Sequence, residues 1–433
     1  MNQPEPAALT AASGPTQAPA TSVATDLKVV LRDGRFRLLL LANFISTIGD
    51  WLTFMALFSL TSFTWNKGVS GISILGIAYM LPVATLSPVA GVWVDRWGLR
   101  RVMVTTSAAR AVIVLAMAAW PHFWSTCVLL CAHQVVASFF NPAQHSALAR
   151  LVRREHLLVA NALNTQAAQL TKILGPGVAG LLVAWLGPRG CFQFDAALLL
   201  VAALFLTQLP RLPGMTAERT NFASEFRVGF TFLRGTTRLR TVILLLMLGL
   251  CALGGFIAVL PVFARDQLGA GPRVMGFLLS SMGAGAAIGA FAVAHAGKKW
   301  DKTWCITSGA WIAAFSLWLV AQTSRVEVAI AATSILGVGV VFLLVPAYAL
   351  LQEETPQDLL GRVVSLAIAA LSMAQMLGMG VIGGAARRWR PVHLLQAEAV
   401  LLGAAALVFL IWSYARRNGR AGRARETFGL PST

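Results

Sequence analysis

Charged residues are scarce in this chain, and acidic ones are the scarcest. Of its 433 residues, 12% are charged, with 17 Asp and Glu against 35 Lys and Arg, whereas 57% are hydrophobic. A soluble domain this apolar would expose larger apolar patches than soluble monomers carry. The composition therefore excludes an ordinary water-soluble protein.

Motifs typical of enzymes and of nucleotide-driven pumps are also absent. The sequence has no His-Glu-x-x-His stretch, no Gly-x-Ser-x-Gly elbow and no Gly-x-x-x-x-Gly-Lys phosphate loop. Its five cysteines form no cluster of the kind that binds metal. We therefore expect no enzyme, no metal site, no cofactor and no direct use of ATP.

What the sequence does contain is a series of long apolar runs. Each has about 20 residues or more, the length a helix needs to cross a hydrocarbon core of ~30 Å. The runs are too uniformly apolar for the alternating strands of a membrane barrel. They predict an all-α integral membrane protein with twelve transmembrane helices, at 38–63, 69–94, 102–120, 124–149, 158–186, 190–209, 241–263, 275–296, 304–322, 327–350, 363–386 and 392–414.

The basic residues favour one side of the predicted membrane. If both termini are cytoplasmic, most of the 35 Lys and Arg fall in the tails and in the loops on that side, and one loop with Arg387, Arg388 and Arg390 departs from the pattern. This is the positive-inside distribution of a membrane protein rather than the patch of a nucleic-acid binder. The basic tail is typical of a segment that binds lipid headgroups.

The runs fall into two groups of six, separated by residues 210–240. There, Phe226, Phe230 and Leu233 have helical spacing beside arginines, which predicts an amphipathic helix on the cytoplasmic face. The N-terminal residues lack an apolar core and are typical of a disordered tail, not a signal peptide. The predicted division is a disordered cytoplasmic tail (1–30), an N-terminal half (31–209), a central loop (210–240), a C-terminal half (241–415) and a basic cytoplasmic tail (416–433).

The two halves also resemble each other at a nearly constant offset. Gly98-Leu-Arg100-Arg101 corresponds to Gly297-Lys298-Lys299, and Pro142-Ala143 corresponds to Pro346-Ala347. Membrane proteins built from two such parallel repeats bind their solute between the halves, near the midplane.

A charged stretch joins the second and third runs: Gly91-Val-Trp-Val-Asp95-Arg96-Trp-Gly98-Leu-Arg100-Arg101. Together with the twelve runs and the central loop, it resembles the major facilitator superfamily over about residues 30–415. Ser46-Thr-Ile-Gly49-Asp50 and Gly361-Arg362 are similar to its bacterial efflux branch, which includes the enterobactin exporter and macrolide efflux proteins. The resemblance implies the major facilitator fold, in a bacterial cytoplasmic membrane.

The resemblance also implies a conformational latch that bridges the two halves on the cytoplasmic side. Asp95 is expected to pair with Arg362 across the pseudo-axis. The latch residues are Gly91, Asp95, Arg96, Gly98, Arg100, Arg101 and Arg362. The alternative is a positively charged turn with an accidental acid, which the positive-inside rule alone would produce.

Asp50 is the strongest candidate for chemistry. It lies about 12 residues into the first run, which is ~18 Å at 1.5 Å per residue. A carboxylate at that depth is costly unless it is paired or hydrated. It could carry the proton of a coupled transporter, or be a structural acid paired with Arg110 or Lys172. Lys172 could instead bind an anionic solute, although neutralising Asp50 is its favoured role.

Other candidates lie in the fourth and fifth runs. His133 and Gln134 occupy the place where antiporters of the main drug branch carry an Arg. Gly175, Pro176 and Gly180 are similar to the antiporter motif of helix 5. Asp195 and Glu398 are peripheral in the family, which favours a packing or interfacial role over one in transport. The glycine-rich stretches of the eighth and eleventh helices are either static packing seams or interfaces that move.

From these features we expect a monomeric or loosely associated secondary transporter that exports an amphipathic small molecule, such as a drug or siderophore, by alternating access. A proton gradient is the expected energy source, and the expected partners are the small-molecule substrate and membrane lipids. Two alternatives of the same fold stay open, a lysophospholipid or lipid flippase and a solute uptake transporter. The fold by itself does not decide between them.

Overall fold

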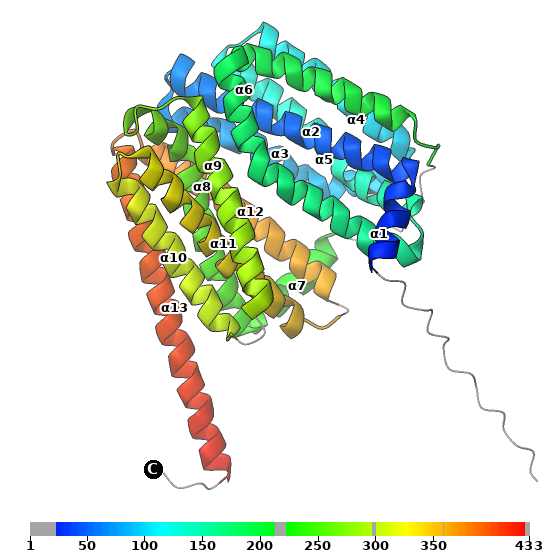
Figure 1. Ribbon diagram of the computed structural model, residues 1–433. Helices are drawn as coiled ribbons and strands as arrows, with labels where there is room; N and C mark the ends of the chain where they lie inside the picture. Colours follow the sequence, from blue (N-terminus) through cyan, green and yellow to red (C-terminus); the bar gives the residue numbers. More distant parts are fainter. Residues whose placement is uncertain (1–22, 213–221, 297–299, 358, 429–433) are drawn as a thin grey trace, which may run out of the picture.

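The computed structural model of the chain describes residues 23–212, 222–296, 300–357 and 359–428, although not every side chain within them. The described residues are helical, with short turns between helices (Figure 1). The helices are α1 (Val23–Arg32), α2 (Gly34–Ser59), α3 (Gly68–Arg96), α4 (Leu99–Ala119), α5 (Phe123–Leu151), α6 (Leu157–Thr207), α7 (Phe222–Gly235), α8 (Thr237–Asp266), α9 (Pro272–Ala296), α10 (Lys302–Gln322), α11 (Val326–Glu354), α12 (Leu360–Ala385) and α13 (Pro391–Phe428). A π-helical turn, Leu60–Thr64, extends α2.

Eleven helices in the described residues are long and apolar enough to cross a membrane, one fewer than the predicted twelve. The difference lies in α6, which with the turn before it covers 54 residues, about 80 Å at 1.5 Å per residue. Its helical geometry is interrupted at Gly187, where φ is 71° and ψ is 169°. Glycine adopts this conformation without a steric penalty. The two parts of α6 correspond to the predicted runs 158–186 and 190–209, which accounts for the difference, and the all-α membrane fold is confirmed.

The chain forms two bundles that meet at an angle (Figure 1). One contains α2 to α6 and the other contains α8 to α13. They touch mainly through α3 against α12 and through the first part of α6 against α9. The internal repeat relates these two contacts to each other. Helix α3 of the first half corresponds to α9 of the second, and the first part of α6 corresponds to α12.

The bundles are in contact at one end and diverge at the other, which carries α1 and α7 (Figure 1). At the closed end, the hydroxyl of Ser70 in α3 donates to the carbonyl of Gly383 in α12 at 2.5 Å. The hydroxyl of Ser62 donates to the carbonyl of Pro261 in α8 at 3.2 Å. The molecule is therefore sealed at the end opposite its N-terminal helix.

The terminal segments differ in part from the prediction. Helix α1 includes residues 23–30 of the predicted disordered tail, because Val30 is buried in an apolar cluster with Phe36 and Leu39. The described residues thus begin with a helix inside the predicted tail of 1–30, and residues 1–22 lie outside the described residues. At the other terminus, α13 continues through the predicted boundary at 415 as far as Phe428.

The predicted helix in the central loop is present as α7. Leu233 packs against the main apolar core, whereas Phe230 is exposed. The side chain of Phe226 lies outside the described residues. Helix α7 contacts α12 and α8, so the loop between the halves packs on the C-terminal bundle.

Candidate functional site

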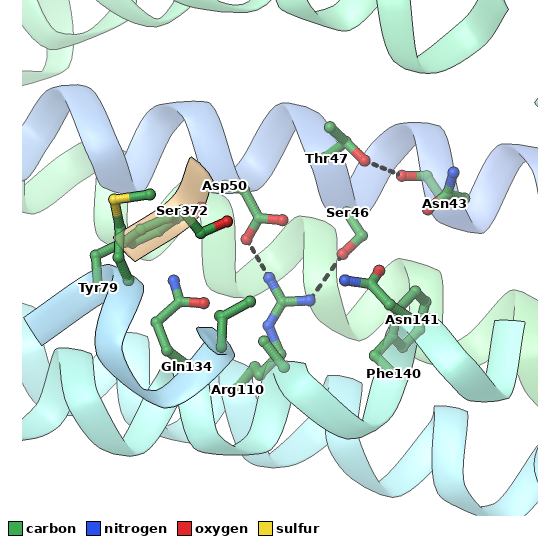
Figure 2. A pocket seen from close by; sticks show the side chains of 13 residues that line it. Asn43, Ser46, Thr47, Asp50, Tyr79, Arg110, Gln134, Phe140, Asn141 and Ser372 are labelled. Carbon is green, nitrogen blue, oxygen red and sulfur yellow. Dashed lines mark hydrogen bonds and ion pairs between the residues drawn. The ribbon is translucent and has the colours of Figure 1, made fainter. Parts of the chain in front are cut away.

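A polar cavity of about 200 Å³ lies among α2, α3, α4 and α5. Figure 2 shows the polar side chains of α2 and of α4 and α5 pointing toward one another across it. Ser372 of α12 also lines it, so the cavity reaches the opposite half. Its lining residues are Asn43, Ser46, Thr47, Asp50, Tyr79, Met80, Val83, Arg110, Gln134, Ala137, Phe140, Asn141 and Ser372.

Asp50 and Arg110 form an ion pair on the wall of this cavity (Figure 2). Arg110 is 2% exposed and also donates to the hydroxyl of Ser46 and to Nε2 of His133, both at 3.1 Å. Because Nε2 of His133 accepts this hydrogen bond, it carries no proton of its own. The guanidinium of Arg110 therefore donates to both Asp50 and His133, because its planar group carries several N–H donors.

A second acid lies directly behind Asp50. Asp195, in the second part of α6, is fully buried against Gly49 and accepts a hydrogen bond of 2.5 Å from the hydroxyl of Thr53. Its other carboxyl oxygen has no partner among the described residues. Two carboxyl groups thus share the neighbourhood of one buried cation. Asp195 thus lies in the core of the N-terminal half, and its predicted packing or interfacial role stays a prediction.

The C-terminal half repeats this arrangement. Glu398 of α13 is 7% exposed and lies against Gly255 of α8, leaving no room there for a Cβ. One of its carboxyl oxygens has no partner in the described part of the chain. In each half, an acid on the last spanning helix packs on a glycine of the first. The two halves therefore also correspond in the position of one buried acid.

Lys172 lies elsewhere. It lines a second cavity, of about 250 Å³, between the first part of α6 and helices α9 and α11. Trp51 and Gln169 border the same space. In the described residues no ion pair involves Lys172, so the favoured sequence interpretation, that it neutralises Asp50, is not what the structure shows. Arg110 is the partner of Asp50.

Similarity to known proteins decides the family. The sequence matches the Major Facilitator Superfamily over residues 39–379 and again over 244–430. The chain belongs to this superfamily. It is therefore a multi-pass membrane protein and a secondary transporter of a small molecule, not an enzyme.

Similar superfamily members include a curated exporter. The chain is 27% identical over 370 residues to YfiS of Bacillus subtilis, an uncharacterized MFS-type transporter, covering 82% of this chain and 87% of YfiS. It is 27% identical over 391 residues to the enterobactin exporter EntS of Shigella boydii, covering 87% and 92%.

Solved structures share the fold. The nucleoside transporter NupG superposes with a TM-score of 0.72 at 13% identity, covering 88% of this chain and 99% of NupG. A bacterial homologue of the lysosomal transporter Spinster, in an inward-facing conformation, gives 0.68 at 14% identity, covering 89% and 96%.

The predicted antiporter motif, Gly175, Pro176 and Gly180, lies in the first part of α6, at the interface between the halves. Gly180 of α6 and Gly276 of α9 approach so closely that a Cβ on either would lie 2.9 Å from the other's Cα. The backbone N–H of Gly177 donates to the hydroxyl of Ser280 at 2.7 Å. Gly175 lies against the indole of Trp51. The motif therefore helps to seal the closed end.

The predicted latch is at the opposite, open end. Gly98 precedes the first residue of α4, whose backbone N–H donates to the carbonyl of Leu212 at 3.1 Å. Arg100 is half-buried, and Arg101 and Arg362 are exposed. The side chains of Asp95 and Arg96 lie outside the described residues, as does the burial of Gly91, so the pairing of Asp95 with Arg362 stays a prediction.

Sequence reasoning missed several polar residues of the first cavity. Asn43 donates to the side-chain oxygen of Asn164 at 3.2 Å, as does Gln144 at the same distance. Tyr79 lines the cavity beside Asp50. A signal was available for α2, because Asn43, Ser46, Thr47 and Asp50 recur at helical spacing and form one polar face. Tyr79 gave no such signal.

Proposed function

We propose that the chain exports an amphipathic small molecule, of the drug or siderophore class, from the bacterial cytoplasm in exchange for protons. One observation carries the proposal, the Asp50–Arg110 pair on the wall of a polar cavity within the spanning helices. Ionisable side chains inside a membrane are costly, and they mark proton relays and solute pathways in transporters. The name of the similar protein EntS supports export and a siderophore-like substrate.

The pair can act as a switch with two states. When Asp50 is charged it holds Arg110, and when it binds a proton Arg110 keeps only the neutral acceptors Ser46 and His133. The two states differ in the attraction between α2 and α4. A difference of this kind biases an equilibrium between two conformations of the bundles.

The open end of the molecule indicates which step of the proposed cycle this state represents. With both termini in the cytoplasm, as the basic loops indicate, the bundles diverge toward the cytoplasm (Figure 1). Asp50 pairs with Arg110 in this state, the arrangement proposed for the step after proton release to the cytoplasm. A cytoplasmic solute then enters and the transporter turns outward, where a proton binds from outside and the solute leaves. The protonated transporter turns back and releases the proton to the cytoplasm.

Everted vesicles with an imposed pH gradient test this function. We expect one compound from a panel of siderophores, macrolides and cationic dyes to collapse the gradient. The Asp50→Asn variant should reduce the rate at least about tenfold, as expected when an essential proton carrier is removed. Glu327→Gln, which neutralises an exposed acid at the start of α11, is the matched control and should transport normally.

Other outcomes separate the alternatives. Collapse that persists in Asp50→Asn would move the proton site away from Asp50. Uptake against the expected direction in oriented vesicles would support a solute importer. Transfer of a labelled lysophospholipid between leaflets, without collapse by any soluble compound, would support a lipid flippase.

A further inference from the structure

The second cavity differs from the first in chemistry. It lies between the two halves, next to the seal that α6 and α9 form, and its walls are mostly apolar. Leu279 and Met282 of α9 and Val340 of α11 supply much of the apolar wall. An apolar cavity with a few convergent polar groups is the usual form of a small-molecule site.

Its polar groups come from one face of α6. Gln169 and Lys172 are exposed into the cavity and follow Thr165, which is exposed on the same helix face. Polar side chains in a membrane helix face a water-filled path or the bundle interior, since exposure to lipid is costly. This stripe therefore faces the open space between the halves rather than lipid.

Lys172 brings the cavity's positive charge. Among the described residues, no acidic side chain lines the cavity and Lys172 forms no ion pair. Asp50, on the neighbouring helix, is already held by Arg110. A lysine without a protein counter-ion beside an apolar space is a ready partner for an anionic group of a ligand.

Trp51 supplies an aromatic part of the cavity wall. Its indole rests on Gly175, which leaves no room for a Cβ, and its ring meets Phe54 edge-on with centroids 5.6 Å apart. The indole is thus held in place by its neighbours. A fixed aromatic wall suits the flat apolar body of a ligand.

We propose that this Lys172 cavity binds the transported molecule, and that the molecule is an amphiphilic organic anion. A carboxylate or phenolate is held by Lys172 and Gln169, and the aromatic or apolar body packs against Trp51, Leu279 and Met282. The proposal rests on the transport function above and adds the substrate class. Because Asp50 and Trp51 are consecutive in α2, proton and substrate occupy two sides of one helix.

Binding to the purified full-length protein, without any gradient, tests the substrate class. The probes are 1-hydroxy-2-naphthoate, its uncharged methyl ester and a naphthylmethylammonium cation, which share a flat aromatic body and differ in charge. We expect the anion to bind more tightly than the ester and the cation. In Lys172→Gln its dissociation constant should rise about tenfold, as for one lost charge-assisted contact.

Three further variants make the result specific. Lys172→Arg should restore most of the anion affinity, and Arg189→Gln, an exposed basic residue near Gly187, should leave it unchanged. Ala287→Glu, which adds an acid to the cavity wall, should weaken anion binding even if Lys172→Gln does not fold. Thermal unfolding of each variant reports on folding.

The outcomes also separate this proposal from proton coupling. Equal affinity for anion and ester, no measurable anion binding, or an unchanged dissociation constant in Lys172→Gln would overturn the anion site. Anion binding that persists in Asp50→Asn, together with lost gradient collapse, supports both proposals. Anion binding with no proton exchange in any vesicle assay would retain the anion site and reject proton coupling.

Discussion

Arg110 is the residue that organises the polar site. It is the cation that meets Asp50, it keeps Nε2 of His133 unprotonated, and it holds Ser46. Asp195, behind Asp50, is left with a hydroxyl donor and an oxygen without a partner in the described residues. A fully buried carboxylate without a cation of its own costs several kcal/mol, so Asp195 is expected to keep a proton throughout the cycle.

This assignment predicts that Asp195→Asn is tolerated. Asparagine offers Thr53 the same kind of acceptor and carries no charge, so transport driven by a pH gradient should stay close to the wild-type level. Thr53→Val should lower the free energy of unfolding by on the order of 0.6 kcal/mol, the average for an interhelical hydrogen bond in a membrane protein. Vesicle transport and denaturant unfolding measure the two effects. Loss of gradient collapse in Asp195→Asn would make Asp195 the coupling site.

At the scale of elements, the glycines of a single helix have two distinct uses. Gly285 of α9 packs against the backbone of Ser334 in α11, inside the C-terminal bundle. Gly276 of the same helix faces Gly180 across the boundary between the bundles. We expect the first to be static packing, and the second to be a contact that separates when the transporter changes state. Small residues allow both kinds of close approach.

Gly276→Leu is therefore expected to trap the transporter in the state that is open at this end. The added side chain has no space against Gly180, so the seal cannot form. A cysteine introduced by Ser280→Cys, beside the seal, should then react with an impermeant maleimide much faster than the same cysteine does in the protein that keeps Gly276. Gly384→Leu, at a glycine with open space around it, is the matched control. Equal labelling in both backgrounds would argue against a moving seal.

At the scale of the whole molecule, Arg265 fastens the two bundles at the closed end. From the end of α8 it donates to the carbonyl of Ser62 and, at 2.6 Å, to the side-chain oxygen of Asn66. Asn66 has a positive φ of 48°, a conformation that asparagine tolerates better than most residues. The Asn66 turn thus presents its side-chain oxygen to the opposite half.

Arg265→Gln should shift the conformational equilibrium toward opening at this end. A hydrogen bond to a charged group contributes about 1.5–3 kcal/mol, so the shift is expected to exceed about tenfold in population. Distances between spin labels on the ends of α2 and α8 report it directly. Arg273→Gln removes an exposed arginine whose ring contact stays within α9, and it should leave the distances unchanged.

The sequence alone determined the membrane-spanning segments, the division into two halves and the family. Long apolar runs, basic loops and the stretch from Gly91 to Arg101 are local signals, because the lipid core requires a minimum helix length. It also singled out Asp50 and Arg110, since charged residues are rare in such runs.

The tertiary structure decided that Arg110 and not Lys172 meets Asp50, that Asp195 and Glu398 pack on glycines of the first helix of each half, and which end is closed. Lipid is as apolar as the protein core, so the hydrophobic pattern hardly encodes which face of a membrane helix points inward. That orientation is set by packing between helices that are distant in the sequence.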